Sequence, residues 1–297
     1  MRAMHGSTGD DQRARYLIEP GELARRLGEP SLAVLDAHVD LPAPRFDGDY
    51  RAQSGQAGWL AQRIPGSVHA DLVGALSDPH AQLSFMRPSA RTLARELGSL
   101  GVGADSDVVI YDRAEGFWAA RLWWMLRWIG VNARVLDGGW RVWQAEGLPV
   151  ETGEPGEVRR ARVVARERDG LWADREDVEA VTAGQVARTL VCALSEPVFS
   201  GRAASRYARR GHIPGSLNVP ARDLFDATGR YRPIAELHAR FASLDQTVPV
   251  CVYCGGGISA AVDALALTLI GRDDVSIYDG SLQEWAADPQ LAMEGEA

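Results

Sequence analysis

Hydrophobic residues along the chain fall into short continuous runs that alternate with longer stretches in which they recur every three or four positions. The short runs are rich in Val, Ile and Leu, which is typical of strands buried on both faces, and the longer stretches predict helices. This alternation predicts an α/β fold in which mostly parallel sheets carry helices on both faces. The expected strands are 32–35, 108–111, 133–136, 158–165, 189–193, 248–253 and 275–278. The expected helices are 20–27, 90–97, 118–130, 139–146, 174–181, 234–242 and 259–270.

The chain contains an internal repeat. Arg63-Ile-Pro-Gly-Ser67 recurs as His212-Ile-Pro-Gly-Ser216, and Leu136-Asp-Gly-Gly-Trp140 recurs more loosely as Tyr278-Asp-Gly-Ser-Leu282. Two anchors in the same order predict two copies of one fold.

A third match lies between these anchors. The run Val108–Asp112 corresponds to Val250–Cys254, so Asp112 stands where the second copy has a cysteine. From there to the aspartate of the following Asp-Gly turn is 25 residues in both copies (137 − 112 and 279 − 254). The predicted organisation is a flexible tail over 1–15, a first domain over 16–150, a Gly- and Pro-rich linker over 151–157 and a second domain over 158–297.

Composition narrows the classes of function. Of 297 residues, 46% are hydrophobic and 24% charged, which is enough for two ordinary cores. The net charge of −8 argues against a nucleic-acid surface, which needs clustered positive charge. All 32 basic residues are arginine, so chemistry that depends on a lysine Schiff base or a phosphate-loop lysine is excluded.

Neither a membrane span nor a secretion signal is expected, because no run of about 18 apolar residues and no apolar leader is found. The three cysteines, Cys192, Cys251 and Cys254, suit a reducing compartment better than a disulfide scaffold. The expectation is a cytoplasmic protein without a metal or an organic cofactor.

Cys254 carries the strongest chemical signal, because it links the apolar run Val248–Tyr253 to a helix through a glycine loop. Glycines let several backbone N–H groups turn toward one point, and the helix directs the positive end of its dipole there. Such surroundings lower the pKa of a cysteine from about 8.5 to roughly 3.5–7.5. The pattern predicts a reactive thiolate, with an inert buried thiol as the alternative. The residues expected to form the backbone cradle are Gly255, Gly256, Gly257, Ile258 and Ser259.

Other uses of these cysteines are disfavoured. Cys251 and Cys254 form a C-x-x-C pair, but three extended residues separate their Cα atoms by about 10 Å, beyond the roughly 7 Å that a disulfide spans. Cys251 and Cys192 are expected to pack inside strands. A zinc site lacks a second ligand pair. A phosphatase loop needs an arginine six residues after its cysteine, and Ala260 stands there.

Together these features resemble the rhodanese (sulfurtransferase) superfamily in its tandem two-domain form, over residues 17–285. The resemblance implies two rhodanese-like domains, the first without a nucleophile and the second active, with the site in the cleft between them. The motifs that carry it are Leu35-Asp-Ala37, both Ile-Pro-Gly-Ser segments, Arg121–Arg127, the turns 136–140 and 278–280, and the Cys254 loop.

The resemblance also implies the reaction. Cys254 would take a sulfane sulfur from a small anionic donor such as thiosulfate or 3-mercaptopyruvate, hold it as a persulfide, and pass it to an acceptor thiol, cyanide or a thioredoxin-like protein. A second hypothesis is a non-catalytic or sensing module that binds a persulfide or a partner protein. It draws on charged residues that the family has and this chain lacks.

The donor-binding residues are less well defined, because two alignments compete. If Cys192–Leu194 fills the place of the family's Asp-x-Arg, both charged residues are absent. If Ser200–Arg202 fills it, Arg202 is kept and Arg206 falls on a substrate arginine. The first is slightly favoured, since it follows the expected strand. The candidates for gripping a carboxylate or sulfonate are Arg206, Arg209, Arg210 and Arg63, and an exposed basic turn is the alternative for the first three.

The side chains of the Cys254 loop do not identify the sulfur donor. Thiosulfate-type relatives carry basic loop residues, and mercaptopyruvate-type relatives have serine where Gly256 stands. The latter also place an acid and a histidine after the first Ile-Pro-Gly motif. Asp71, Asp78 and His80 are candidates to replace that pair, with simple solvent exposure as the alternative.

Overall fold

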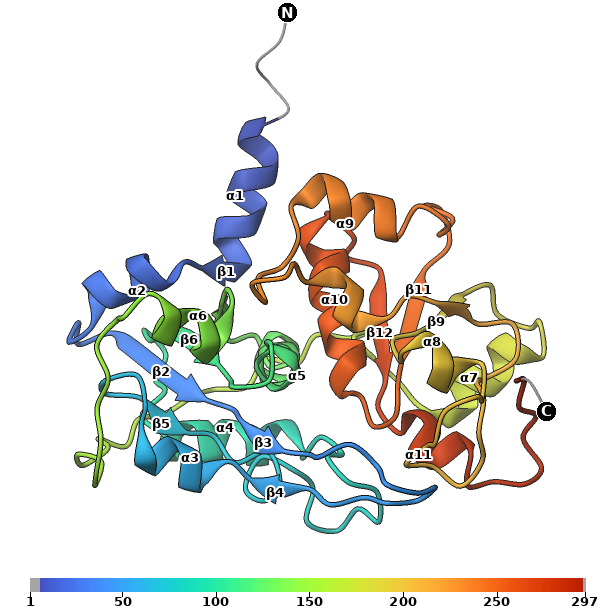
Figure 1. Ribbon diagram of the computed structural model, residues 1–297, viewed down its shortest axis with the longest axis horizontal. Helices are drawn as coiled ribbons and strands as arrows, with labels where there is room; N and C mark the ends of the chain where they lie inside the picture. The colour runs from blue at the N-terminus through green and yellow to red at the C-terminus, as the bar shows by residue number, and fades with distance from the viewer. Residues whose placement is uncertain (1–5, 296–297) are drawn as a thin grey trace, which may run out of the picture.

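The computed structural model describes residues 6–295 and contains two α/β domains that repeat one topology (Figure 1). Each domain has a five-stranded sheet in which all neighbouring strands are parallel. The strand order is β5-β2-β6-β7-β1 in the first sheet and β10-β9-β11-β12-β8 in the second, so every strand has a counterpart. The predicted pair of tandem α/β domains is confirmed.

The elements lie in the chain in the order that the internal repeat predicts. Those of the first domain are α1 (Gly6–Tyr16), β1 (Leu17–Ile18), α2 (Pro20–Arg26), β2 (Leu32–Asp36), β3 (Val39–Asp40), β4 (Gln53–Ser54), α3 (Gln56–Ala61), β5 (Val68–His69), α4 (Ala90–Ser99), β6 (Asp107–Tyr111), α5 (Phe117–Trp128), β7 (Ala133–Leu136) and α6 (Gly139–Ala145). Those of the second are β8 (Trp172–Ala173), α7 (Arg175–Thr182), β9 (Thr189–Cys192), α8 (Glu196–Phe199), β10 (Leu217–Asn218), the 3₁₀ turn η1 (Ala221–Leu224), α9 (Ile234–Arg240), β11 (Val250–Tyr253), α10 (Ile258–Leu269), β12 (Val275–Tyr278) and α11 (Ser281–Trp285).

Helices α5 and α10 pack against each other between the two sheets (Figure 1). Each follows the central strand of its own sheet, β6 or β11, and each begins after a glycine with positive φ, Gly116 or Gly257. Almost all of their side chains are buried, which explains why neither has a polar face. This helix pair makes the domain interface part of one continuous hydrophobic core.

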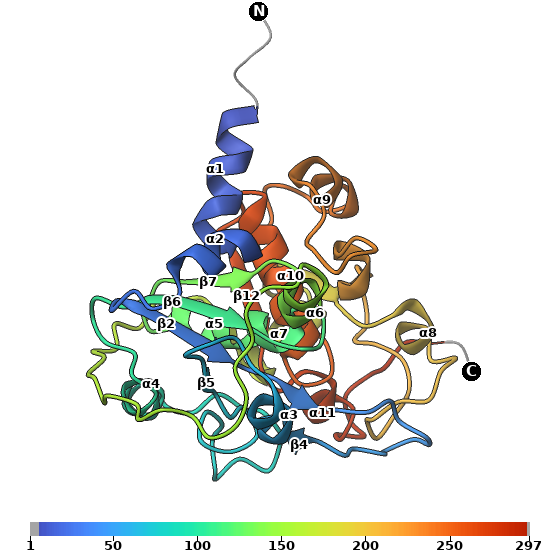
Figure 2. The same cartoon turned by 60° about the vertical axis from the view of Figure 1, so that its left-hand side comes forward.

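The amino-terminal segment differs from the expected tail. Residues 6–16 form α1, which lies beside α10 (Figure 2). Gln12 donates a hydrogen bond to Thr268 O at 3.0 Å, and Arg13 pairs with the buried Asp137. Polar side chains fix this helix to the folded core, a signal that hydrophobic periodicity does not report. Residues 1–5 of the expected tail lie outside the described part.

The strand expected at 158–165 is wrong. This segment runs extended along the first domain and pairs with no strand. Ala161 N donates to Gly98 O at 2.9 Å and Arg166 N to Ile129 O at 2.8 Å, so carbonyls at helix ends, rather than a sheet edge, accept from its backbone. The first strand of the second sheet is β8, further along the chain.

The loop between β3 and β4 leaves the first domain and reaches the second, where it ends near α8 and α11 (Figure 1). Gly48 N donates to Ser205 O at 2.8 Å, and Ser205 N donates to Asp47 Oδ1 at 2.8 Å. The loop over residues 41–52 and the segment 203–210 therefore form a contact between the domains.

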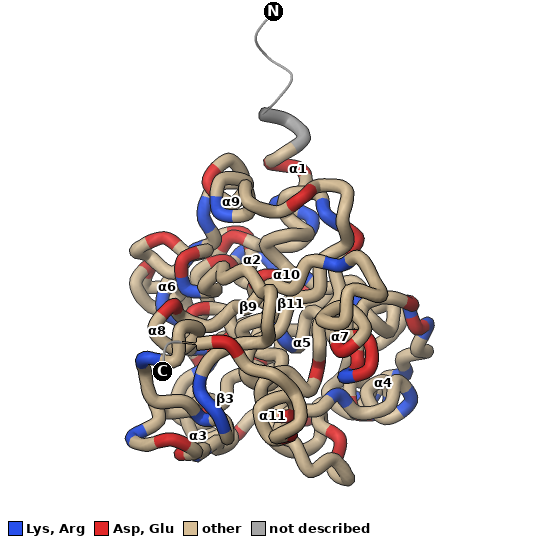
Figure 3. The backbone as a smooth tube through the Cα atoms, turned by 90° about the vertical axis from the view of Figure 1, so that its right-hand side faces the viewer, with Lys and Arg blue, Asp and Glu red and all other residues tan. Residues whose placement is uncertain are grey.

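Basic and acidic positions are intermixed over the second domain (Figure 3). Within residues 6–295, no helix has both the length and the apolar character required to cross a bilayer.

Candidate active site

Cys254 lies directly after β11, at the carboxyl-terminal edge of the second sheet, where open parallel sheets bind their ligands. The start of α11 fixes its backbone, because Cys254 N donates to Ser281 Oγ at 3.1 Å and Leu282 N donates to Cys254 O at 3.1 Å. The residue is only 2% exposed. The thiol is therefore held in place, and reagents reach it only after a covering group moves.

A different side chain closes in on each loop glycine. A Cβ atom on Gly255 would overlap the ring and hydroxyl of Tyr207, and one on Gly256 would overlap the amide of Gln283. One on Gly257, whose φ is 77°, would lie 2.7 Å from Arg121 Nη1. The Tyr207 ring excludes a side chain at Gly255, and the positive φ favours glycine at Gly257, whereas Gly256 contacts only the flexible end of Gln283.

The first domain shows what this type of loop binds. Asp112 is fully buried, and its Oδ1 accepts hydrogen bonds from Ala114 N at 2.8 Å and Gly116 N at 2.9 Å. Its Oδ2 accepts one from Ala119 N at 2.8 Å. Three backbone amides at the start of α5 thus hold one anion, as expected for a helix amino terminus.

The second loop has the same plan with one residue fewer. Gly116 is four residues after Asp112, and Gly257 is three after Cys254 (116 − 112 and 257 − 254). Ala119 is three residues after Gly116, and Ala260 is three residues after Gly257, so Ala260 corresponds to Ala119. Ala260 lies one residue beyond the predicted cradle, Gly255 to Ser259.

The other two cysteines are inert. Burial raises the pKa of Cys192 to about 12 and the pKa of Cys251 to about 11. Both side chains are packed in the core beside the sheet, as predicted. Neither is ionised at neutral pH.

Three of the four candidate arginines form hydrogen bonds or ion pairs with groups other than Cys254. Arg63 is fully buried, lies 2.5 Å from Glu151 and donates to Gly153 O at 2.6 Å, so it anchors the linker. Arg209 donates to four carbonyls around the end of α11, those of Trp285, Ala286, Asp288 and Leu291.

Arg210 pairs with Asp47 at 2.8 Å and strengthens the contact between the two loops. Arg206 is different, because it donates to Pro42 O at 2.7 Å and is next in sequence to Tyr207, which lies against Gly255. Of these four arginines, Arg206 is therefore the one whose sequence neighbour contacts the Cys254 loop.

The register of the strands supports the first of the two alignments with the family's Asp-x-Arg motif. Asp36 pairs in register with Tyr111, and Cys192 pairs in register with Tyr253. Cys192 consequently holds in the second domain the place that Asp36 holds in the first. This correspondence favours Cys192–Leu194 in the place of the family's Asp-x-Arg.

Two of the three candidates to replace the family's acid and histidine form hydrogen bonds within their own loops. Asp71 Oδ1 accepts from Val73 N at 3.0 Å, and Asp78 Oδ1 accepts from His80 N at 2.9 Å, so both carboxylates stabilise local turns. The neighbouring residue Ser84 does reach the site, because its N–H donates to Gln283 Oε1 at 3.0 Å.

A buried ion pair joins the domains behind the glycine loop. Arg121, on α5, lies 2.7 Å from Asp279 Oδ1 and donates to Phe85 O at 2.6 Å. Asp279 Oδ2 also accepts from Arg87 N at 2.9 Å. Arg121 belongs to the family motif 121–127, but its place beside Gly257 could not be predicted from the sequence.

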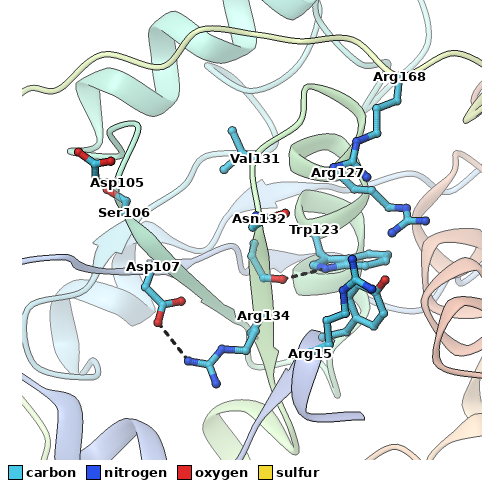
Figure 4. Close-up of a pocket in the computed structure, with 12 residues that line it drawn as sticks. Arg15, Asp105, Ser106, Asp107, Trp123, Arg127, Val131, Asn132, Arg134 and Arg168 are labelled. Atoms are coloured by element: carbon cyan, nitrogen blue, oxygen red, sulfur yellow. Dashed lines mark hydrogen bonds and ion pairs between the residues drawn. The ribbon is translucent and has the colours of Figure 1, made fainter. Parts of the chain in front are cut away.

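Figure 4 shows a separate cavity of about 430 Å³ at the opposite, amino-terminal edge of the first sheet. It is lined by Arg15, Arg127, Arg134 and Arg168, and Cys254 is not among its lining residues. Arg134 is neutralised by Asp107 at 3.2 Å and by Glu22 at 2.8 Å. Because it lies at the wrong end of the strands, we assign this cavity no part in the reaction.

Comparison with known proteins agrees with this geometry. The model of the Rhodanese-like domain matches residues 19–146 and 186–288. The chain belongs to the rhodanese family. It is 35% identical to the probable 3-mercaptopyruvate sulfurtransferase of Pseudomonas aeruginosa, over 92% of this chain and 96% of the relative. The 3-mercaptopyruvate sulfurtransferase of Escherichia coli K12 is 34% identical, over 92% and 95%.

Solved rhodanese structures share the whole architecture. Tum1 from Saccharomyces cerevisiae superimposes with a TM-score of 0.82 at 25% identity, over 95% of this chain and 99% of that one. SseA from Escherichia coli superimposes with a TM-score of 0.78 at 31% identity, over 90% and 98%. The family and its curated members make this rhodanese a sulfurtransferase, as the sequence motifs implied.

Proposed function

We propose that this sulfurtransferase works through a persulfide on Cys254. In the first half-reaction the Cys254 thiolate attacks the outer sulfur of a small anionic donor. With thiosulfate, the S–S bond of the donor breaks, a new S–S bond forms on Cys254 and sulfite leaves. With 3-mercaptopyruvate, the C–S bond breaks, the thiol proton passes to the carbon and pyruvate leaves.

The observation that carries this proposal is the Asp112 carboxylate in the matching loop, which accepts hydrogen bonds from three backbone amides. An aspartate oxygen is two bonds from Cβ, and so is the outer sulfur of a cysteine persulfide. The corresponding amides of the second loop are therefore suited to hold a persulfide anion.

In the second half-reaction an acceptor removes the sulfur. A thiol acceptor forms its own persulfide and returns Cys254 to the thiolate, whereas cyanide leaves as thiocyanate. A thioredoxin-like protein is the expected acceptor of larger size. Because donor and acceptor use the same sulfur in turn, steady-state kinetics should be ping-pong.

Mass spectrometry after exposure to each donor tests the proposal. A gain of about 32 Da should map to Cys254. Cys254→Ser should remove both the adduct and turnover, while Cys251→Ala, a matched change in the adjoining strand, should keep both. Turnover that survives Cys254→Ser would reject the proposal. A stable adduct with no turnover for any acceptor would favour the sensing module instead.

A further inference from the structure

Two tyrosines, one from each domain, meet at the Cys254 loop. Tyr207 belongs to the irregular segment 203–210 and lies against Gly255. Tyr50 belongs to the loop between β3 and β4, and its hydroxyl accepts a hydrogen bond from Gln283 Nε2 at 3.3 Å. Because Gln283 in turn lies against Gly256, both phenols are placed on the path to the nucleophile.

The phenols are neutral hydrogen-bonding groups. Burial raises the pKa of Tyr207 and the pKa of Tyr50 above the usual value, so each keeps its proton at neutral pH. Phe85 packs beside Tyr50 with ring centroids 6.2 Å apart. The entrance therefore combines O–H donors with apolar ring faces.

Arg206 supplies the positive charge at this entrance. It donates to Pro42 O at 2.7 Å, and its Nε is buried without a hydrogen-bond partner. Over residues 6–295 no carboxylate pairs with it. By contrast, Arg121 and Arg87, the nearby cations of the first domain, both lie beside Asp279.

We propose that Tyr50, Tyr207 and Arg206 form the specificity surface for the sulfur donor and select small monoanions over dianions such as thiosulfate. This inference rests on the proposed function of Cys254. A single guanidinium balances one negative charge, and burying a second, unpaired charge costs free energy. The loop itself adds no charged side chain, since residues 255–257 are all glycine.

Tyr207 also accounts for the closed state of the site. Cys254 is 2% exposed and Tyr207 lies against the adjacent Gly255, so in this proposal the Tyr207 ring moves aside to admit the donor. A monoanion that offers its carboxylate to Arg206 and its oxo group to the phenols can take the place of that ring.

The first test measures persulfide formation in a single turnover, by mass, with 3-mercaptopyruvate and with thiosulfate. Wild type should react at least about tenfold faster with the monoanion. Arg206→Gln should slow that reaction roughly 10- to 100-fold, the value of a hydrogen bond to a charged group, and should change the thiosulfate rate by less than about threefold. Arg206→Lys should recover part of the loss, and Arg240→Gln, on the remote helix α9, should have no effect.

A second measurement does not depend on sulfur transfer. Pyruvate should protect Cys254 from iodoacetamide, sulfate should protect much less, and Arg206→Gln or Tyr207→Phe should weaken only the pyruvate effect. Equal protection by the two anions, or an equal loss of both donor rates in Arg206→Gln, would overturn the specificity surface. Protection by pyruvate without any sulfur adduct would support the surface and reject the persulfide chemistry.

Discussion

At the scale of single residues, one position decides what each loop of amides holds. In the first domain the Asp112 carboxylate accepts the loop amides, whereas we propose that in the second domain a persulfide on Cys254 does so. The other loop residues then have two tasks, because they must present N–H groups and make room for Tyr207, Gln283 and Arg121. This double requirement explains the glycines at positions 255 and 257.

Cys254→Asp tests the cradle directly. Its carboxylate should accept the amides as Asp112 does, so the variant should unfold with a free energy about 1–3 kcal/mol higher than Cys254→Ser. Both variants should lack sulfur transfer. Urea unfolding followed by tryptophan fluorescence measures the difference. A lower stability for the aspartate variant would show that the second loop does not present its amides to an anion.

At the scale of elements, two irregular segments close the site more than any helix or strand does. The loop 41–52 and the segment 203–210 are joined through Asp47, which accepts from Ser205 N and pairs with Arg210. Arg210 lowers the pKa of Asp47, as does the Ser205 amide, so the carboxylate is charged at neutral pH. A partly exposed contact of this kind is weak enough to open during turnover.

Asp47→Asn should therefore loosen the cover over Cys254. We expect iodoacetamide to modify Cys254 about three- to tenfold faster, since an exposed ion pair and one hydrogen bond contribute on the order of 1 kcal/mol. Glu236→Gln, which removes an exposed pair on α9, is the matched control and should leave the rate unchanged. An unchanged rate in Asp47→Asn would mean that this contact does not control access.

The same elements show where sequence reasoning stops. Continuous apolar runs identified the long central strands, β6 and β11, together with the helices that follow them. The edge strands β1, β5, β8 and β10 have two residues each, too few for any periodicity to appear. The extended segment 158–168 alternates like a strand, yet long-range contacts with helix ends determine where it lies.

The residues of the site also divide into those that the sequence predicts and those that it does not. Cys254, its glycine loop and the place of Asp112 could be predicted, because these features are local in the chain. Tyr50, Arg121 and Gln283 could not, since only folding brings them beside the loop. The arginines are hard to assign from the sequence for a different reason. Arg206, Arg209 and Arg210 lie close together in the chain, and the sequence does not show which of them turns toward the site and which binds backbone carbonyls.

At the scale of the whole molecule, the two domains form one core around α5 and α10. Matched aspartates secure this interface from both sides. Asp279 of the second domain pairs with Arg121, and Asp137 of the first pairs with Arg13 on α1. Tyr231 N adds a hydrogen bond to Asp137 Oδ1 at 2.9 Å.

Arg121→Met should destabilise the protein more than Arg13→Met. Arg121 is 1% exposed, so its loss leaves Asp279 as a buried charge without its guanidinium, at a cost of about 3–5 kcal/mol. Arg13 is 22% exposed, and water can replace part of its interaction. Urea unfolding of both variants provides the comparison. Equal losses, or a smaller loss for Arg121→Met, would show that the Asp279 pair does not secure the interface.

The Asp112 side chain has one more consequence. Because it is part of the chain, the Asp112 carboxylate occupies the amide cradle of the first domain permanently. Under the proposed mechanism, negative charge arrives at the amino terminus of α10 and leaves again in each catalytic round, while α5 beside it keeps the charge of Asp112. The duplication therefore leaves one helix amino terminus with a built-in anion and the other, under the same proposal, with an exchangeable one.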